Sequence, residues 1–175
     1  MKALATFEEC GYTIGRLYCL RTLIDIDLVD APHSALQQAL EILGCREGRE
    51  LPRESSYLTA AAARAALACQ NHSLSARLAS STLNAAEHLS CALLLVESHL
   101  LLAQVRSMTP LDDFWRDHIL EACRIADTSG LAIELESARA CLSDPNHLSR
   151  LCGYRSGSVV RPQLRLPTTN LLLSE

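Results

Sequence analysis

Aromatic residues and glycine are scarce in this chain of 175 residues. Phe, Trp and Tyr together make up 4% of it and glycine occurs seven times, whereas 49% of the residues are hydrophobic, most of them leucine and alanine. β-Strands draw on Val, Ile, Tyr and Phe, while leucine and alanine favour helices. The composition therefore argues against a β-sandwich and against general disorder, and it predicts an all-α protein with a sizeable core.

An excess of positive charge is also missing. The formal net charge is −4, so the overall electrostatics give no support to direct nucleic-acid binding. The charges are unevenly distributed: residues 110–144 hold eight acidic and three basic side chains, and residues 145–175 hold one acidic and four basic ones. An acidic region followed by a basic tail is either two solvated surfaces or two surfaces in contact.

No signal-peptide pattern and no clear membrane span occur in the sequence. The longest nearly uncharged run, residues 89–105, is interrupted by Glu97 and His99 and is at the short limit for crossing a bilayer. The eight cysteines are spread along the chain, mostly inside apolar helical segments. Such cysteines behave as small hydrophobic residues, so we expect free thiols in a reducing, cytoplasmic compartment.

Apolar residues recur with helical spacing in about seven segments. Pro32 is placed to begin a helix, Gly44 and Gly130 to end one, and Ser34 and Ser55 or Ser56 to cap one. The expected helices cover approximately residues 6–26, 34–44, 57–70, 74–89, 91–107, 110–129 and 131–142.

These segments predict one helical-repeat domain over residues 1–152, followed by a tail. A polar linker with Gly48 and Pro52 separates an N-terminal hairpin, residues 1–52, from a main stack, residues 53–152. From residue 153 glycine, proline and arginine become frequent, which predicts an extended or mobile tail over residues 153–175.

An internal repeat is visible in small-residue pairs. Leu67-Ala68, Leu102-Ala103 and Ser137-Ala138 recur at intervals of 35 residues. This pattern resembles the tetratricopeptide repeat, although the tryptophan and Leu-Gly-x-Tyr positions of that family are absent. The resemblance implies antiparallel helical hairpins stacked as a short right-handed α-solenoid, with a surface for a protein or peptide partner on the first helices.

Under the 35-residue shift, polar residues of the first helices form columns. Arg64, His99 and Glu134 make one column, and Gln104 and Arg139 share another with Cys69. Polar groups repeating on apolar helices face either plain solvent or a ligand, and the lone Trp115 is either core or a binding anchor. The predicted partner-binding residues are Arg64, Glu97, His99, Gln104, Arg106, Trp115, Glu134 and Arg139.

Motifs for catalysis or cofactor binding are not found. There is no phosphate loop, nucleophile elbow or His-Glu-x-x-His motif. Cys69 and His72 have the ligand types of a zinc site together with His88 and Cys91, but the two pairs lie at opposite ends of an expected helix. We therefore expect no metal, no cofactor and no enzymatic activity.

The sequence thus favours a scaffold, adaptor or assembly subunit that binds another polypeptide, with self-association through the stack ends or the tail. The alternative is a helical sensing domain with an apolar cavity for a small molecule, and an enzyme using a cysteine or histidine is a third reading. For the tail we expect contacts from Arg155, Arg161 and Arg165 to the acidic residues 110–144.

Overall fold

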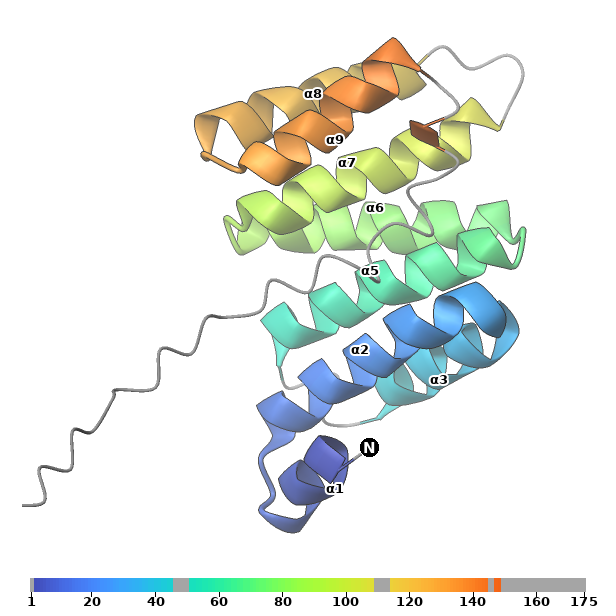
Figure 1. Ribbon diagram of the computed structural model, residues 1–175, viewed down its shortest axis with the longest axis vertical. Coiled ribbons are helices and arrows are strands. Elements are labelled where there is room, and N and C mark those ends of the chain that lie inside the picture. Colours follow the sequence, from blue (N-terminus) through green and yellow to red (C-terminus); the bar gives the residue numbers. More distant parts are fainter. Residues whose placement is uncertain (1, 46–50, 109–113, 145–146, 149–175) are drawn as a thin grey trace, which may run out of the picture.

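The protein is all α-helical, which confirms the prediction from composition (Figure 1). The computed structural model describes residues 2–45, 51–108, 114–144 and 147–148, and no strand occurs among them. Eight helices lie in these residues: α1 (Lys2–Glu9), α2 (Thr13–Asp30), α3 (Pro32–Gly44), α5 (Pro52–Ala68), α6 (His72–His88), α7 (Ala92–Ser107), α8 (Trp115–Thr128) and α9 (Ala132–Ser143). The predicted tail contacts of Arg155, Arg161 and Arg165 fall outside the described residues.

The helices pack in the order in which they occur in the chain, along the long axis of the molecule (Figure 1). α3 lies against both α2 and α5, α6 against both α5 and α7, and α8 against both α7 and α9. The helices α2, α5 and α7 also contact one another in sequence. Each helix therefore finds its apolar contacts in its near neighbours.

The two central helices are buried almost all round. α5 has eleven buried residues, six of them alanines, and α7 has ten. Alanine lets neighbouring helix axes approach closely, and α5 contacts α2, α3, α6 and α7. The strongly apolar run of α7 has the same cause, because α5, α6, α8 and α9 all pack against it.

The N-terminus differs from the single helix predicted for residues 6–26. Gly11 adopts a left-handed conformation with φ of +68°, and the chain breaks there into α1 and α2. Gly15 is buried beneath Phe7 and Tyr12: a Cβ at this position would lie 2.9 Å from Phe7 Cδ1 and 2.5 Å from Tyr12 Cδ1. The two glycines thus allow α1 to fold back onto α2.

Pro32 begins a helix as predicted, but the serines expected to cap two helices do not. α3 and α5 begin at Pro32 and Pro52, which stand in the first turn where a missing N–H costs nothing. Ser34, Ser55 and Ser56 lie inside these helices rather than at their caps, and the Ser56 hydroxyl donates to the carbonyl of Pro52 at 2.6 Å.

The structural spacing is longer than the predicted 35 residues. The helices α2, α5, α7 and α9 begin at Thr13, Pro52, Ala92 and Ala132, so their starts are 39, 40 and 40 residues apart. The repeat interval of 35 residues inferred from the Leu-Ala and Ser-Ala pairs is therefore wrong. The alanines of these pairs are also not equivalent in burial, because Ala103 and Ala138 are buried and Ala68 is exposed. Leucine and alanine are so frequent here that such pairs recur without structural equivalence.

Four helix ends use the same turn. One residue takes a left-handed conformation, and the N–H of the next residue donates to the carbonyl five positions earlier, as in a Schellman motif. The left-handed residues are Gly11, Gln70, Ser90 and Gly130, and the donors that follow them are Tyr12, Asn71, Cys91 and Leu131, with N–H···O distances between 2.8 and 3.0 Å.

We predict that Ser90→Gly stabilises the protein. A side chain in the left-handed region costs about 1–2 kcal/mol, part of which glycine's greater unfolded-state entropy offsets. Urea unfolding is expected to show a gain on the order of 0.5–1 kcal/mol. The matched control is Ser80→Gly, in the exposed interior of α6, which should destabilise the protein. A loss in both variants would contradict this account of the turn.

Candidate functional site

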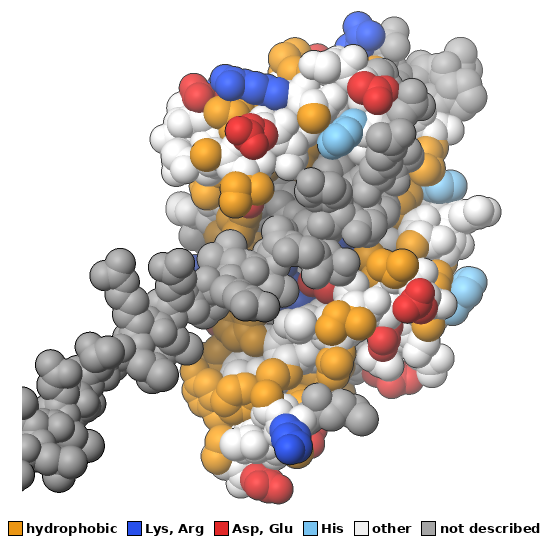
Figure 2. All heavy atoms as spheres, viewed as in Figure 1, with side chains coloured by type: hydrophobic (Ala, Val, Ile, Leu, Met, Phe, Trp, Pro, Cys, Tyr) orange, Lys and Arg blue, Asp and Glu red, His pale blue; other side chains and the backbone are white. Residues whose placement is uncertain are grey.

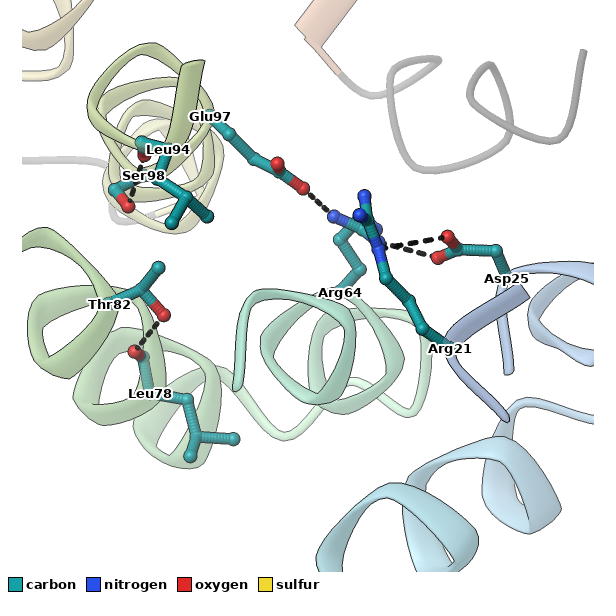
Figure 3. Close-up of polar contacts among 8 residues, drawn as sticks. All are labelled: Arg21, Asp25, Arg64, Leu78, Thr82, Leu94, Glu97 and Ser98. Carbon is teal, nitrogen blue, oxygen red and sulfur yellow. Dashed lines mark hydrogen bonds and ion pairs between the residues drawn. The ribbon is translucent and has the colours of Figure 1, made fainter. Parts of the chain in front are cut away.

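A buried ion-pair network joins α2, α5 and α7 (Figure 3). Arg64 of α5 lies between Glu97 of α7, to which its Nη1 donates, and Asp25 of α2, whose Oδ1 is 2.5 Å from Nη2. Arg64 and Glu97 are each only 3% exposed. One guanidinium thus bonds to carboxylates that are 39 and 33 residues away from it in the sequence.

Arg21 extends this network toward solvent. Its Nε lies 3.8 Å from Asp25 Oδ2, and its guanidinium stacks over the Tyr57 ring with 4.8 Å from Cζ to the ring centroid. The network of Arg21, Asp25, Arg64 and Glu97 contains two cations and two carboxylates. Buried charges are tolerable when they are paired and hydrogen-bonded in this way.

Tyr57 makes a second polar link between α5 and α7. Its hydroxyl lies 3.4 Å from Cys91 Sγ at the start of α7. Burial raises the pKa of Tyr57, and the neighbouring thiol raises it further, while Arg53 acts in the opposite direction. The phenol therefore stays neutral and serves as a hydrogen-bonding partner between the two helices.

Two predicted partner-binding residues, Arg64 and Glu97, are therefore directly bonded to each other. These two residues and Gln104 are all buried, so they do not lie on the open surface that was expected to face either solvent or a ligand. Gln104 donates from Nε2 to the carbonyl of Leu148, which holds the short segment after α9 against α7. The reason is geometric: α5 and α7 are enclosed by neighbouring helices, so their polar residues are buried together with the apolar ones.

We predict that Arg64→Met destabilises the protein strongly. The change leaves Glu97 and Asp25 without the guanidinium that compensates them, a loss of roughly 3–5 kcal/mol for a buried pair. Urea unfolding would measure it, and adding Glu97→Leu to Arg64→Met should recover part of the loss. Arg124→Met is the control, because Arg124 pairs with Glu121 on the exposed face of α8 and should matter little. Equal effects of the two single substitutions would count against the network.

His99 faces α8 rather than the ion-pair network. Its Nδ1 lies 3.0 Å from Nδ1 of His118, so one imidazole donates and the other accepts. Burial lowers the pKa of His99, the charge of Arg124 lowers it further, and Glu121 opposes this effect. The pair suits neutral rings, since two protonated imidazoles would bring two N–H donors together.

Stability should therefore fall as the solution is acidified. The pKa of His99 is lowered in the folded state from the ordinary 6.5, so below about 6.5 the unfolded chain binds the extra proton first and unfolding becomes easier. We expect His99→Gln to flatten this dependence between about pH 7.5 and pH 5.5 in urea titrations. His33→Gln, at an exposed position of α3, is the control and should retain the wild-type slope. A His99→Gln profile as steep as that of the wild type would contradict the assignment.

The remaining predicted site residues do not join one cluster. Arg106 lies over the Phe114 ring with 5.9 Å to its centroid, and half-buried Trp115 packs against the core of α7, α8 and α9. Glu134 is half-buried, and exposed Arg139 lies 4.0 Å from Asp127. Arg106 lies on α7, Trp115 on α8, and Glu134 and Arg139 on α9.

An apolar groove at the opposite end was missed by sequence reasoning. It has a volume of about 520 Å³, opens to the surface, and lies between α1 and α2. On α2 its walls are Gly15, Tyr18, Cys19, Thr22, Leu23 and Ile26, and on α1 they include Ala3, Leu4 and Phe7. The helical spacing of these α2 residues was a usable signal, but the expectation of one continuous helix concealed it.

Hydrophobic side chains are visible as a patch over the N-terminal part of α2 (Figure 2). Tyr18 and Ile26 are 45% and 53% exposed, which is unusual for side chains of this size in a helix that also has a buried face. Tyr18 and Ile26 both line the groove between α1 and α2.

The cysteines are more varied than the prediction of buried residues. Of the seven in the described part of the chain, all free thiols, Cys141 is buried, whereas Cys10 and Cys45 are exposed. Burial raises the pKa of Cys141 to about 11, so this thiol remains protonated near neutral pH.

Within the residues that the structure describes, no group of three or more His, Cys, Asp or Glu side chains is arranged to hold a metal ion. None of the helices described combines the length and apolar character that a membrane crossing requires. Comparison of the chain with protein-family models, with curated proteins and with solved structures found no match.

Proposed function

We propose that this chain is a non-enzymatic protein–protein interaction module that acts as a scaffold, adaptor or assembly subunit. In this proposal the helix pairs are hairpins of a short right-handed α-solenoid related to the tetratricopeptide class. The first-helix starts are about 40 residues apart, whereas that class repeats at about 34. The proposed similarity to the tetratricopeptide class therefore concerns the order in which the helices pack and not the length of the repeat.

The proposal is supported mainly by the location of the exposed apolar surface. Nine of the eleven large hydrophobic residues described as exposed lie at the two ends of the stack. Those at one end are Tyr12, Tyr18, Ile26, Val29 and Leu40, and those at the other are Phe114, Leu120, Ile133 and Leu142. Concentrated apolar surface of this kind is typical of contact with another polypeptide.

A rigid framework supports the same role. The Asp25–Arg64–Glu97 network links α2 to α5 and α7, so the exposed surface of α2 is held in a defined position relative to these helices. A surface that is ordered before binding loses less conformational entropy on association.

The second candidate, small-molecule sensing, requires an enclosed apolar cavity. The groove between α1 and α2 is large enough for a small ligand, but it is open along one side. An open apolar groove suits a polypeptide better, because its walls cover one face of the occupant and leave the other in water.

Photocrosslinking in cells of the source organism would test the proposal. Benzoylphenylalanine replacing Tyr18 or Ile133 should give a covalent adduct with a polypeptide, because these side chains are exposed at the two ends. The same residue replacing Arg77, exposed on α6, is the control and should give none. Absence of an adduct at both ends, or equal adducts at all three positions, would contradict the proposed function.

A further inference from the structure

The packing of the other helices indicates what kind of element fits the groove. Each of three helices is covered by the helix that precedes it in the chain: α5 by α3, α7 by α6, and α9 by α8. The covering helices α3, α6 and α8 have 13, 17 and 14 residues. α2 has 18 residues, but the helix before it, α1, has only 8. The groove is the part of α2 that a full-length helix in this position would cover.

The residues of α2 that line the groove form a helical stripe. They stand at positions 15, 18, 19, 22, 23 and 26, which is the spacing of one helix face. The stripe contains Tyr18, Leu23 and Ile26, so its contact surface is that of an ordinary helix–helix interface. An occupant with apolar residues at i, i+3 or i+4, and i+7 would pack into it.

The negative charge at the C-terminal end of α2 indicates which charge the occupant of the groove would carry. Asp27 and Asp30 lie in the last turn, where the helix macrodipole is itself negative and no basic residue of α2 compensates it. Asp30 is exposed and stands four residues after Ile26, on the same face as the groove. A cationic side chain beside this end would be stabilised by both carboxylates and by the dipole.

We propose that the α1–α2 groove binds a basic amphipathic helix from a partner polypeptide, which packs along the part of α2 that α1 leaves uncovered. This inference rests on the proposed function and gives it a site and a class of partner. An anionic membrane surface suits the groove less well, because the carboxylates of Asp27 and Asp30 would be repelled by acidic lipids.

Selection from a displayed library of random 16-residue peptides against the full chain tests the proposal. We expect enriched peptides with apolar residues at helical spacing and Lys or Arg on the flanks. Ile26→Glu should weaken their binding by about tenfold or more, as loss of a central interface contact does. Ile133→Glu is the matched control: Ile26 and Ile133 are 53% and 59% exposed, and binding should be unchanged.

A charge reversal tests the chemistry of the partner separately. Asp27→Lys combined with Asp30→Lys should weaken the enriched basic peptides and favour versions in which their Lys and Arg are replaced by Glu. Urea unfolding of each variant checks that the fold is intact, which is expected because Ile26 and Asp30 are exposed. If the charge-reversed variant bound the enriched basic peptides as tightly as the wild type does, the inference that the partner is basic would be wrong.

Other outcomes would overturn the groove assignment. They are an absence of enrichment, enriched peptides without helical periodicity, and binding that survives Ile26→Glu. A wild-type dimer in sedimentation that Ile26→Glu dissociates would assign the groove to a second copy. Binding to phosphatidylserine vesicles that the same change abolishes would assign it to a membrane, and selection that succeeds only after removal of residues 149–175 would assign it to the chain's own tail.

Failure of this inference is distinguishable from failure of the proposed function. If benzoylphenylalanine at Ile133 gives a polypeptide adduct while Ile26→Glu leaves peptide binding intact, the interaction role stands and the groove assignment falls. If neither end gives an adduct and no peptide is enriched, both fall.

Discussion

The packing of α2, α5 and α7 depends on a single buried cation, the guanidinium of Arg64. Arg64 reaches from the alanine-rich centre of α5 to carboxylates on α2 and α7, and these three helices form the spine of the stack. Its alanine neighbours have no side chains long enough to compete for the space between the helices. We infer that the paired charges favour one register of these helices, because sliding or rotation would leave a buried charge without its partner.

The apolar surface that stays exposed lies mainly at the two ends of the molecule. Each central helix is enclosed by neighbours, so its apolar residues are satisfied internally, and exposed apolar surface collects at α1–α2 and α8–α9. The short α1 makes the N-terminal end the more open of the two, because it covers only part of α2. This exposed apolar surface supports the proposed interaction role. The acidic C-terminal end of α2 favours a polypeptide that carries basic side chains.

Sequence reasoning located most helices because their apolar periodicity is strong, as in α6 and α8. It misjudged the polar residues because periodicity within a helix says nothing about which helix lies opposite. Arg64 and Glu97 were both among the predicted partner-binding residues, yet their direct bond joins positions 33 residues apart, which no local pattern reports. Asp25 gave no signal beyond its position four residues after Arg21.

The sequence by itself determined the fold class, the all-round apolarity of α7 and several helix ends, since these depend on local propensity, capping and composition. Pro32 begins a helix and Gly130 ends one for reasons contained in a few neighbouring residues. The tertiary structure alone decided the roles of the polar side chains, the 40-residue spacing and the groove on α2. These depend on which helices meet, and that is set by the packing of the whole stack.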